Sequence, residues 1–365
     1  MLESFIDRFG EATVALTAGL VLGAAFGALA RASRFCLRSA VLDSVTGKGL
    51  GALAVWLAAA GLAIAGTQAL VLAGIIDPAA IRLLTGSASI SGVIIGGLLF
   101  GAGMVLARGC VSRLMVLSAG GNLRALVTLA VFATVAYATM KGPLGDVRTL
   151  VNGLAQTSDP AALSVVGWSG IGTAGALASG LAIAGLAVVI ALGSGTSARR
   201  LAAGGLIGLV VAAAYGFTGL LAAVSFDPQP VRGLSFIAPT VNSAATLIGA
   251  PGGRLDLEFA LVPGVILGAF LVALLTRSFR VEWFQTPFSP LRYGFGGALM
   301  GFGGVLAGGC TMGNGLSGWA VYATFALVAL SAVIIGAVVT HLAVDQPRGV
   351  DHGRAIPPVD VVLSH

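Results

Sequence analysis

Hydrophobic residues fill the chain in long, nearly unbroken runs, and most polar positions fall between these runs. A transmembrane helix needs about 17 to 25 predominantly apolar residues to cross roughly 30 Å of hydrocarbon. Windows of this kind begin near residues 13, 50, 90, 123, 163, 200, 259, 291 and 319. The pattern therefore predicts an all-α integral membrane protein with about nine transmembrane helices.

Composition supports the same fold class. Hydrophobic residues make up 57% of the chain and charged residues 9%, and the mean hydropathy is +1.00. These values exclude a soluble globular domain. The segment before the first window carries Glu3, Asp7 and Arg8 but lacks the basic start and the small-residue cleavage site of a signal peptide. We expect this segment to stay attached.

Basic residues predict the orientation, because cytoplasmic loops carry an excess of Lys and Arg. Three groups fall on one side of a nine-span protein: Arg31 to Lys48, Arg199 with Arg200, and Arg277 to Arg292. We expect a multi-pass protein of the cell (inner) membrane with its N-terminus outside and its C-terminus in the cytoplasm. The outer loops, at roughly 74–89, 141–160 and 223–258, then carry the candidates for a basic rim that collects anions. These candidates are Lys141, Arg148, Arg232 and Arg254.

The chain contains an internal repeat. Residues 97–110 and 297–310 are identical at nine of 14 positions, including four glycines and the final cysteine. The repeat predicts units 13–140 and 200–343, joined by a single span at 163–192. Because one span joins them, the second unit enters the membrane from the opposite side and is inverted relative to the first. We therefore expect two inverted pseudo-symmetric halves in one transport domain, 1–343. Residues 344–365 are polar and contain prolines, and we expect a flexible cytoplasmic tail there.

Two glycine-rich segments, 109–122 and 309–318, follow the repeated apolar runs without a charged exit loop. We interpret them as re-entrant helical hairpins, which survive at membrane depth only where protein or water surrounds them. Gly109 and Gly309 directly precede the repeated cysteines. A glycine at the end of a helix frees the turn and brings the thiol to the wall of a path.

The three cysteines, Cys36, Cys110 and Cys310, are the candidate site residues. A metal site is not expected, because no CxxC pair occurs and the three histidines lie at or after the last span. No cofactor is expected either. A structural disulfide would leave one thiol over, and buried cysteines acting as small apolar residues are the plainer alternative.

Arginines accompany two of the cysteines. Cys36 follows Arg34 in a basic segment, which either attracts an anion or marks a cytoplasmic flank. Arg108 stands where the second half has Gly308, and Arg113 stands where it has Gly313. A charged residue at membrane depth is a functional candidate. We expect these arginines to hold an anion or to mark a substrate different from that of related chains.

Three segments together carry a resemblance to a known family. They are SRFCLRSAVLD (33–43), FGAGMVLARGCVSR (100–113) and GFGGVLAGGCTMGNGLSG (301–318). Each resembles one of the three cysteine motifs of the YeeE/YedE sulfur-transport family, and the match extends from about residue 13 to 343. The resemblance implies a membrane protein, not an enzyme, that takes up thiosulfate through a narrow path where Cys36, Cys110 and Cys310 contact the ion in turn.

The expected partners follow from this resemblance and from the composition. They are thiosulfate or a related anion, membrane lipid, and a possible cytoplasmic sulfur-handling protein; no nucleic acid is expected. Thiols suit passage because a weak S–H donor binds a dianion loosely enough to release it. The alternatives are another sulfur or selenium anion, a membrane thiol or persulfide relay enzyme, and an accessory scaffold.

Overall fold

The computed structural model describes residue 6 and residues 8–85, 88–157, 163–225, 229–284 and 289–345. Eight segments of this part are long and apolar enough to span a membrane. The long helices are α2 (Glu11–Ser33), α4 (Gly51–Leu72), α5 (Ile90–Leu106), α7 (Leu123–Lys141), α11 (Gly172–Gly193), α12 (Ala198–Val224), α14 (Leu257–Leu275), α15 (Ser289–Leu306) and α16 (Thr324–Val344). The chain is thus an all-α multi-pass membrane protein. The window expected from residue 291 is α15, which is 18 residues long.

Short helices lie between the long ones and follow breaks in the chain. They are α3 (Leu37–Val45), α6 (Val111–Ala119), α13 (Ile237–Leu247) and the π-helical turn η3 (Gly313–Gly318). Both glycine-rich segments that we expected to interrupt the spans are therefore breaks. The segment 223–258, which we expected to be an outer loop, is not simply a loop. It contains α13, in which Thr240, Asn242 and Ser243 are buried.

Three loops that the sequence assigns to the outside meet on one face of the protein. Strand β1 (Ala88–Ser89) pairs with β2 (Gln156–Thr157), and Ile81 bridges to Val231. The smaller elements here are η1 (Pro78–Ala80), η2 (Arg82–Leu84), α8 (Gly145–Gly153) and α10 (Val165–Ser169). Glu11, at the start of α2, accepts a hydrogen bond from Ser225 at 2.6 Å. The start of the first span thus lies with these loops.

The basic loops meet one another in the same way. Arg31 donates to the Ser278 hydroxyl at 2.7 Å, and Arg200 donates to the Ser33 carbonyl at 2.9 Å. Arg280 donates its backbone N–H to the Gly120 carbonyl at 3.1 Å. The three basic groups that predict the orientation therefore lie together, away from the loops joined by β1 and β2.

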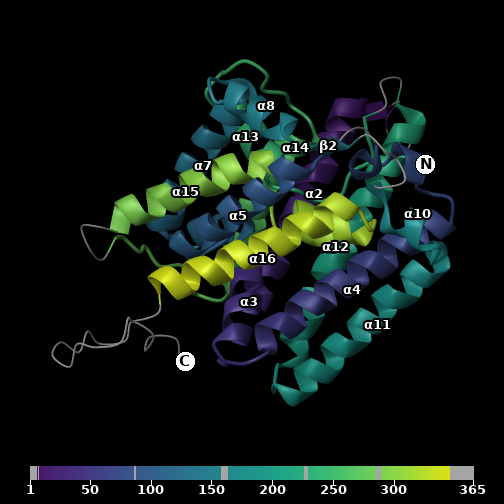
Figure 1. Cartoon of the computed structure of the whole chain (residues 1–365), viewed down its shortest axis with the longest axis horizontal. Coiled ribbons are helices and arrows are strands. Elements are labelled where there is room, and N and C mark those ends of the chain that lie inside the picture. Colours follow the sequence, from purple (N-terminus) through teal and green to yellow (C-terminus); the bar gives the residue numbers. More distant parts are fainter. Residues whose placement is uncertain are drawn as a thin grey trace.

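Glycines allow the long helices to pack with their backbones in contact. A Cβ on Gly27 would lie 2.1 Å from the Val265 carbonyl oxygen, so α2 and α14 touch directly. Small residues of this kind are typical of helix contacts in membranes. The same close packing joins α4 to α12, α5 to α16, and α15 to both α5 and α7. Figure 1 shows α11 beside α4 at one edge, which agrees with their packing.

Candidate transport site

Cys36 stands at a break between two helices. Helix α2 ends at Ser33, and Arg34 adopts left-handed backbone with φ of 54°. Such a conformation reverses the chain without a long loop. Cys36 then precedes α3, and its thiol faces the backbone N–H of Ser39 in the first turn. Only 6% of Cys36 is exposed.

Cys110 stands at a matching break between α5 and α6. Arg108 has φ of 54°, and the equivalent Gly308 in the second half has φ of 69°. The left-handed residues are therefore Arg108 and Gly308. Our expectation that Gly109 and Gly309 free the turn was wrong, because the turn is made one residue earlier. Gly309 is required for another reason: a Cβ there would lie 2.6 Å from Asn314 Oδ1.

The structure brings Cys36 and Cys110 together. Both side chains are buried in the same cluster, and the two thiols lie close enough to interact electrostatically. The Cys110 thiol also lies 3.3 Å from the Ser112 hydroxyl and faces the backbone N–H of Arg113. The first turns of α3 and α6 thus converge on a pair of thiols.

Arginines lie beside this pair. Arg113 interacts electrostatically with Cys36, with Arg31 and with Arg200. Arg34 is exposed but lies within electrostatic range of Arg200. Like charges close together destabilise one another, so such a group favours binding of an anion between its members. Arg108 differs from the rest, because it is exposed at the break after α5.

Cys310 lies in the second half and is 1% exposed. It belongs to the same buried cluster as Cys36 and Cys110. The backbone of the break is held by Asn314, which donates to the carbonyls of Ala307 and Gly309 at 3.1 Å each. Sequence reasoning did not single out Asn314, although it lies four residues after the cysteine.

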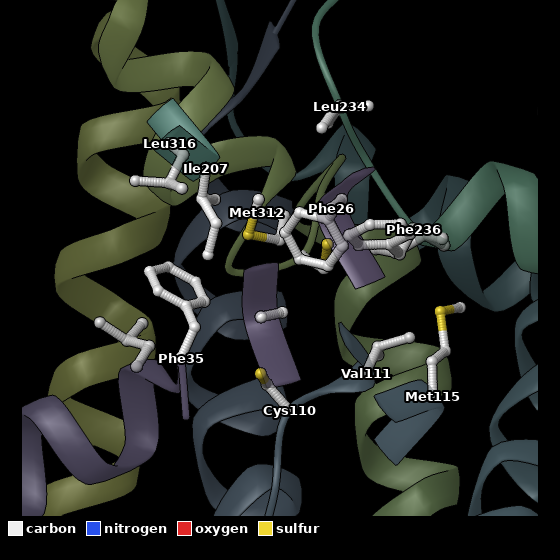
Figure 2. Packing of buried hydrophobic residues seen from close by; sticks show 14 of the residues in the cluster. Phe26, Phe35, Cys110, Val111, Met115, Ile207, Leu234, Phe236, Met312 and Leu316 are labelled. Carbon is white, nitrogen blue, oxygen red and sulfur yellow. The ribbon is translucent and has the colours of Figure 1, made fainter. Parts of the chain in front are cut away.

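Apolar side chains surround the three thiols in a single buried cluster. Figure 2 shows Cys110 among them, with Phe26, Phe236 and Met312. The rings of Phe26 and Phe236 lie 4.9 Å apart. Phe236 occupies the place 200 residues after Cys36 and precedes α13 as Cys36 precedes α3.

A cavity of about 360 Å³ opens on the face where the loops joined by β1 and β2 meet. Its lining includes Arg82, Arg148 and Arg232, and η3 contributes Asn314 and Ser317. The cavity therefore reaches the segment that directly follows Cys310. Two of the four expected rim residues, Arg148 and Arg232, line it. Lys141 and Arg254 do not, and Lys141 donates to the Gly252 carbonyl instead.

The charge of this cavity is positive on balance. Arg232 pairs with Glu258, whereas no carboxylate among the described residues pairs with Arg82 or Arg148. Asn152 also lines the cavity, and the N–H groups of its amide are donors for an anion. Free guanidinium groups and amides are suitable ligands for an oxyanion. Arg82 and Asn152 were missed in the sequence because they lie on separate loops that only the fold brings together.

The basic face also contains a partly buried network, centred on Asp345 at the end of α16. Asp345 accepts from Arg292 at 2.7 Å and lies 3.8 Å from Arg38 and 3.3 Å from His341. Partial burial raises the pKa of Asp345, but hydrogen bonds from Arg292 and His341 outweigh it and hold the pKa below its ordinary 3.8. The network ties α16 and α15 to the first turn of α3, which Cys36 precedes.

No group of three or more His, Cys, Asp or Glu side chains gathers as metal ligands would, within the residues that the structure describes. The site therefore consists of thiols, guanidinium groups, amides and backbone N–H groups. This set of weak and strong donors is suited to an anion.

Comparison with known proteins agrees with an anion site. A model of the family described as sulphur transport matches residues 32–339. The chain is 29% identical over 336 residues to the thiosulfate transporter TsuA of Escherichia coli, which covers 88% of this chain and 92% of that protein. It is 28% identical over 323 residues to the thiosulfate transporter TsuA of Spirochaeta thermophila, with 82% and 90% covered.

Proposed function

Because this chain belongs to the sulphur transport family, we propose that it carries thiosulfate, or a closely related sulfur-containing anion, across a membrane. One observation carries the proposal: the segment that follows Cys310 lines a positively charged cavity and belongs to the same buried cluster as Cys36 and Cys110. The relatives are named transporters, which disfavours a persulfide relay enzyme.

The proposed path begins in the cavity, where Arg82, Arg148 and Arg232 attract the anion. It continues past Cys310 to Cys110 and Cys36, and it ends among the arginines near Arg34 and Arg113. Each thiol offers a weak S–H donor, so each site binds the dianion weakly enough to release it. The strong donors lie only at the two ends, where hydration compensates for release.

The apolar cluster around the thiols supports a closed path in this conformation. Phe26, Phe236 and Met312 are fully or almost fully buried, and a dianion cannot cross such a layer unaided. Passage then requires the short helices that carry the thiols to shift. The backbone contacts between long helices leave little room for them to move, so we assign the motion to α3, α6 and η3.

We propose that the two halves are inverted repeats. Pairs of packed helices recur when the halves are exchanged: α2 with α14 matches α12 with α4, and α5 with α16 matches α15 with α7. Helices α5 and α15 support inversion most directly. Gly96 packs on Gly303 and Gly103 packs on Gly296, so these equivalent helices run antiparallel about a common crossing.

The grouping of loops supports the expected orientation. The N-terminal end of α2 lies with the loops around the cavity, and the end of α16 lies with the basic segments. Cytoplasmic loops carry an excess of Lys and Arg, so the basic segments belong on the cytoplasmic side. The cavity then opens outside, and the thiol pair lies toward the cytoplasm. We propose the cell (inner) membrane, with uptake from the cavity to the thiol pair, where a cytoplasmic sulfur-handling protein would receive the ion. Lipid would surround the long helices.

The experiment is uptake of radiolabelled thiosulfate by proteoliposomes that contain the purified protein. We expect time-dependent accumulation that unlabelled thiosulfate suppresses. Sulfate, sulfite and selenate at equal excess serve as competitors and define the anion that the site prefers. No accumulation with folded, correctly inserted protein would overturn thiosulfate as the substrate, and stronger competition by another of these anions would name the replacement.

A further inference from the structure

One acid lies among the arginines of the cavity. Glu258, in the first turn of α14, is the only carboxylate among the described residues that line it. The other charged residues of the lining are Arg82, Arg148 and Arg232. The Glu258 carboxylate accepts a hydrogen bond from the Arg232 guanidinium, and the two form an ion pair. An acid repels an entering anion, so its position in a cavity that collects anions calls for a specific role.

The backbone of Arg232 is fixed on two sides. Val231 donates to the Ala80 carbonyl and accepts from the Arg82 N–H, both at 3.0 Å. The Thr218 hydroxyl accepts from the Arg232 N–H at 3.2 Å and lies 2.9 Å from the Arg232 carbonyl oxygen. Arg232 is thus anchored to η1 and η2 on one side and to α12 on the other. The bridge also places Arg82 and Arg232 at neighbouring positions of two paired segments.

The Glu258 carboxylate is held less firmly than its partner. Arg232 is its only hydrogen-bond partner among the described residues, and 17% of the Glu258 side chain is exposed. The nearby Asp256 is different, because it accepts from the Phe259 N–H at 2.9 Å and from Asn242 at 2.8 Å. Asp256 therefore fixes the start of α14, whereas Glu258 is able to turn away from Arg232 into the open cavity.

We propose that Glu258 is an internal competitor of the transported anion: its carboxylate occupies Arg232 while the cavity is empty and yields Arg232 to an entering divalent oxyanion. The role rests on the proposed function, because the entering anion is the one that the chain carries. Three arginines and one ionised glutamate give the cavity lining a net charge of two, which a dianion neutralises. Without the glutamate, the lining would hold the dianion more tightly.

Exchange of partners suits release as well as binding. Arg232 directly precedes Gly233, where a Cβ would lie 2.7 Å from Ser317 Oγ of η3, and Ser317 donates to the Leu234 carbonyl at 2.6 Å. An anion that leaves Arg232 is therefore beside η3. As it leaves, Glu258 returns to Arg232, so the guanidinium is not left without a partner. Transport requires binding weak enough for release, and the competing carboxylate provides this.

Uptake kinetics test the competition. Initial rates of radiolabelled thiosulfate uptake in proteoliposomes give the KM and the maximal rate of the wild type and of Glu258→Gln. We expect the KM to fall about two- to fivefold, the range for one ion pair of this kind, and the maximal rate to fall with it. Glu282→Gln is the matched control, because it removes a carboxylate paired with Arg124 outside the cavity, and it should change neither quantity. An unchanged or higher KM in Glu258→Gln would overturn the proposal.

A double substitution tests whether Glu258 acts through Arg232. Arg232→Gln alone should raise the KM. In the Arg232→Gln background, Glu258→Gln should have little further effect, because the guanidinium for which the carboxylate competes is gone. A full decrease of the KM in that background would overturn exchange at Arg232 and assign the effect to net charge.

Equilibrium binding separates this role from the proposed function and from a slowed transport cycle, which also lowers the KM. Purified full-length protein in detergent is titrated with thiosulfate, sulfate or selenate, and the rise of the unfolding midpoint reports affinity. Glu258→Gln should bind the preferred anion more tightly than the wild type. Equal affinities, or no rise with any of the three anions, would overturn the competition. Tighter binding in Glu258→Gln without thiosulfate uptake by the wild type would instead overturn the proposed function alone.

Discussion

Gly27 of α2 lies directly against the carbonyl group of Val265 of α14: a Cβ on Gly27 would be 2.1 Å from the Val265 oxygen. This oxygen belongs to the backbone of α14, so it cannot move away by a change of rotamer. Gly27→Ala therefore forces the two helices apart, and we expect it to destabilise the protein by about 1–3 kcal/mol, the range for overpacked interiors. Thermal unfolding in detergent measures the change.

Gly185 provides the matched control, because nothing lies within 4 Å of a Cβ placed there on α11. Gly185→Ala should leave the unfolding midpoint unchanged or raise it slightly, since alanine is the better helix former by about 1 kcal/mol. Equal destabilisation by the two substitutions would contradict the account of the α2–α14 contact.

Asn314 maintains the break that follows Cys310. Asn314→Leu would leave the carbonyl groups of Ala307 and Gly309 without its amide, and an unpaired buried carbonyl costs about 1–3 kcal/mol. We expect a lower unfolding midpoint together with slower thiosulfate uptake. Ser331→Ala, on the exposed face of α16, is the control that should change neither quantity. Uptake at the wild-type rate in Asn314→Leu would show that this break is not part of the path.

The Asp345 network makes stability depend on pH. The folded-state pKa of Asp345 lies below its ordinary 3.8, so its stabilising effect is fully present above that value and is lost as the pH falls through the folded-state pKa. Asp345→Asn should therefore lower the unfolding midpoint at pH 7, and the gap between wild type and variant should narrow below about pH 4. Unfolding midpoints from pH 3 to pH 7 test this, and a gap that does not vary with pH would be evidence against the ion pairs.

Arg148 is expected to collect the anion in the cavity without taking part in later steps. Arg148→Gln should raise the KM for uptake about two- to fivefold, as expected from the energy of a partly exposed charge, and leave the maximal rate unchanged. Added salt should reduce the difference between variant and wild type. Arg254→Gln removes the same charge outside the cavity and should have no effect on KM. Equal effects of both substitutions would assign the change to net charge alone.

The sequence predicted the long helices and the breaks after the repeated glycines, because length, hydropathy and glycine are local properties. It did not predict α13. This helix has only 11 residues and includes Thr240, Asn242 and Ser243, so it lacks the apolar length of a span. Its polar groups are satisfied by tertiary contacts, as when Asn242 bonds to Asp256 at 2.8 Å.

The candidate site was predictable in its residue types but not in its geometry. Each cysteine was recognisable from its glycine-rich or basic surroundings, yet nothing in the spacing of 74 residues indicates that Cys36 and Cys110 lie in one buried cluster. The same holds for the cavity, where Arg82 and Arg148 line one surface because β1 pairs with β2. Such contacts depend on the packing of remote segments.

The most direct test of a thiol-lined path is the initial rate of radiolabelled thiosulfate uptake in proteoliposomes with Cys36→Ser, Cys110→Ser or Cys310→Ser. Serine keeps the size of the side chain and removes the weak, polarisable thiol donor. We expect each substitution to reduce uptake to near the level of empty liposomes while the unfolding midpoint stays close to that of the wild type. Uptake at the wild-type rate in all three variants would contradict the account.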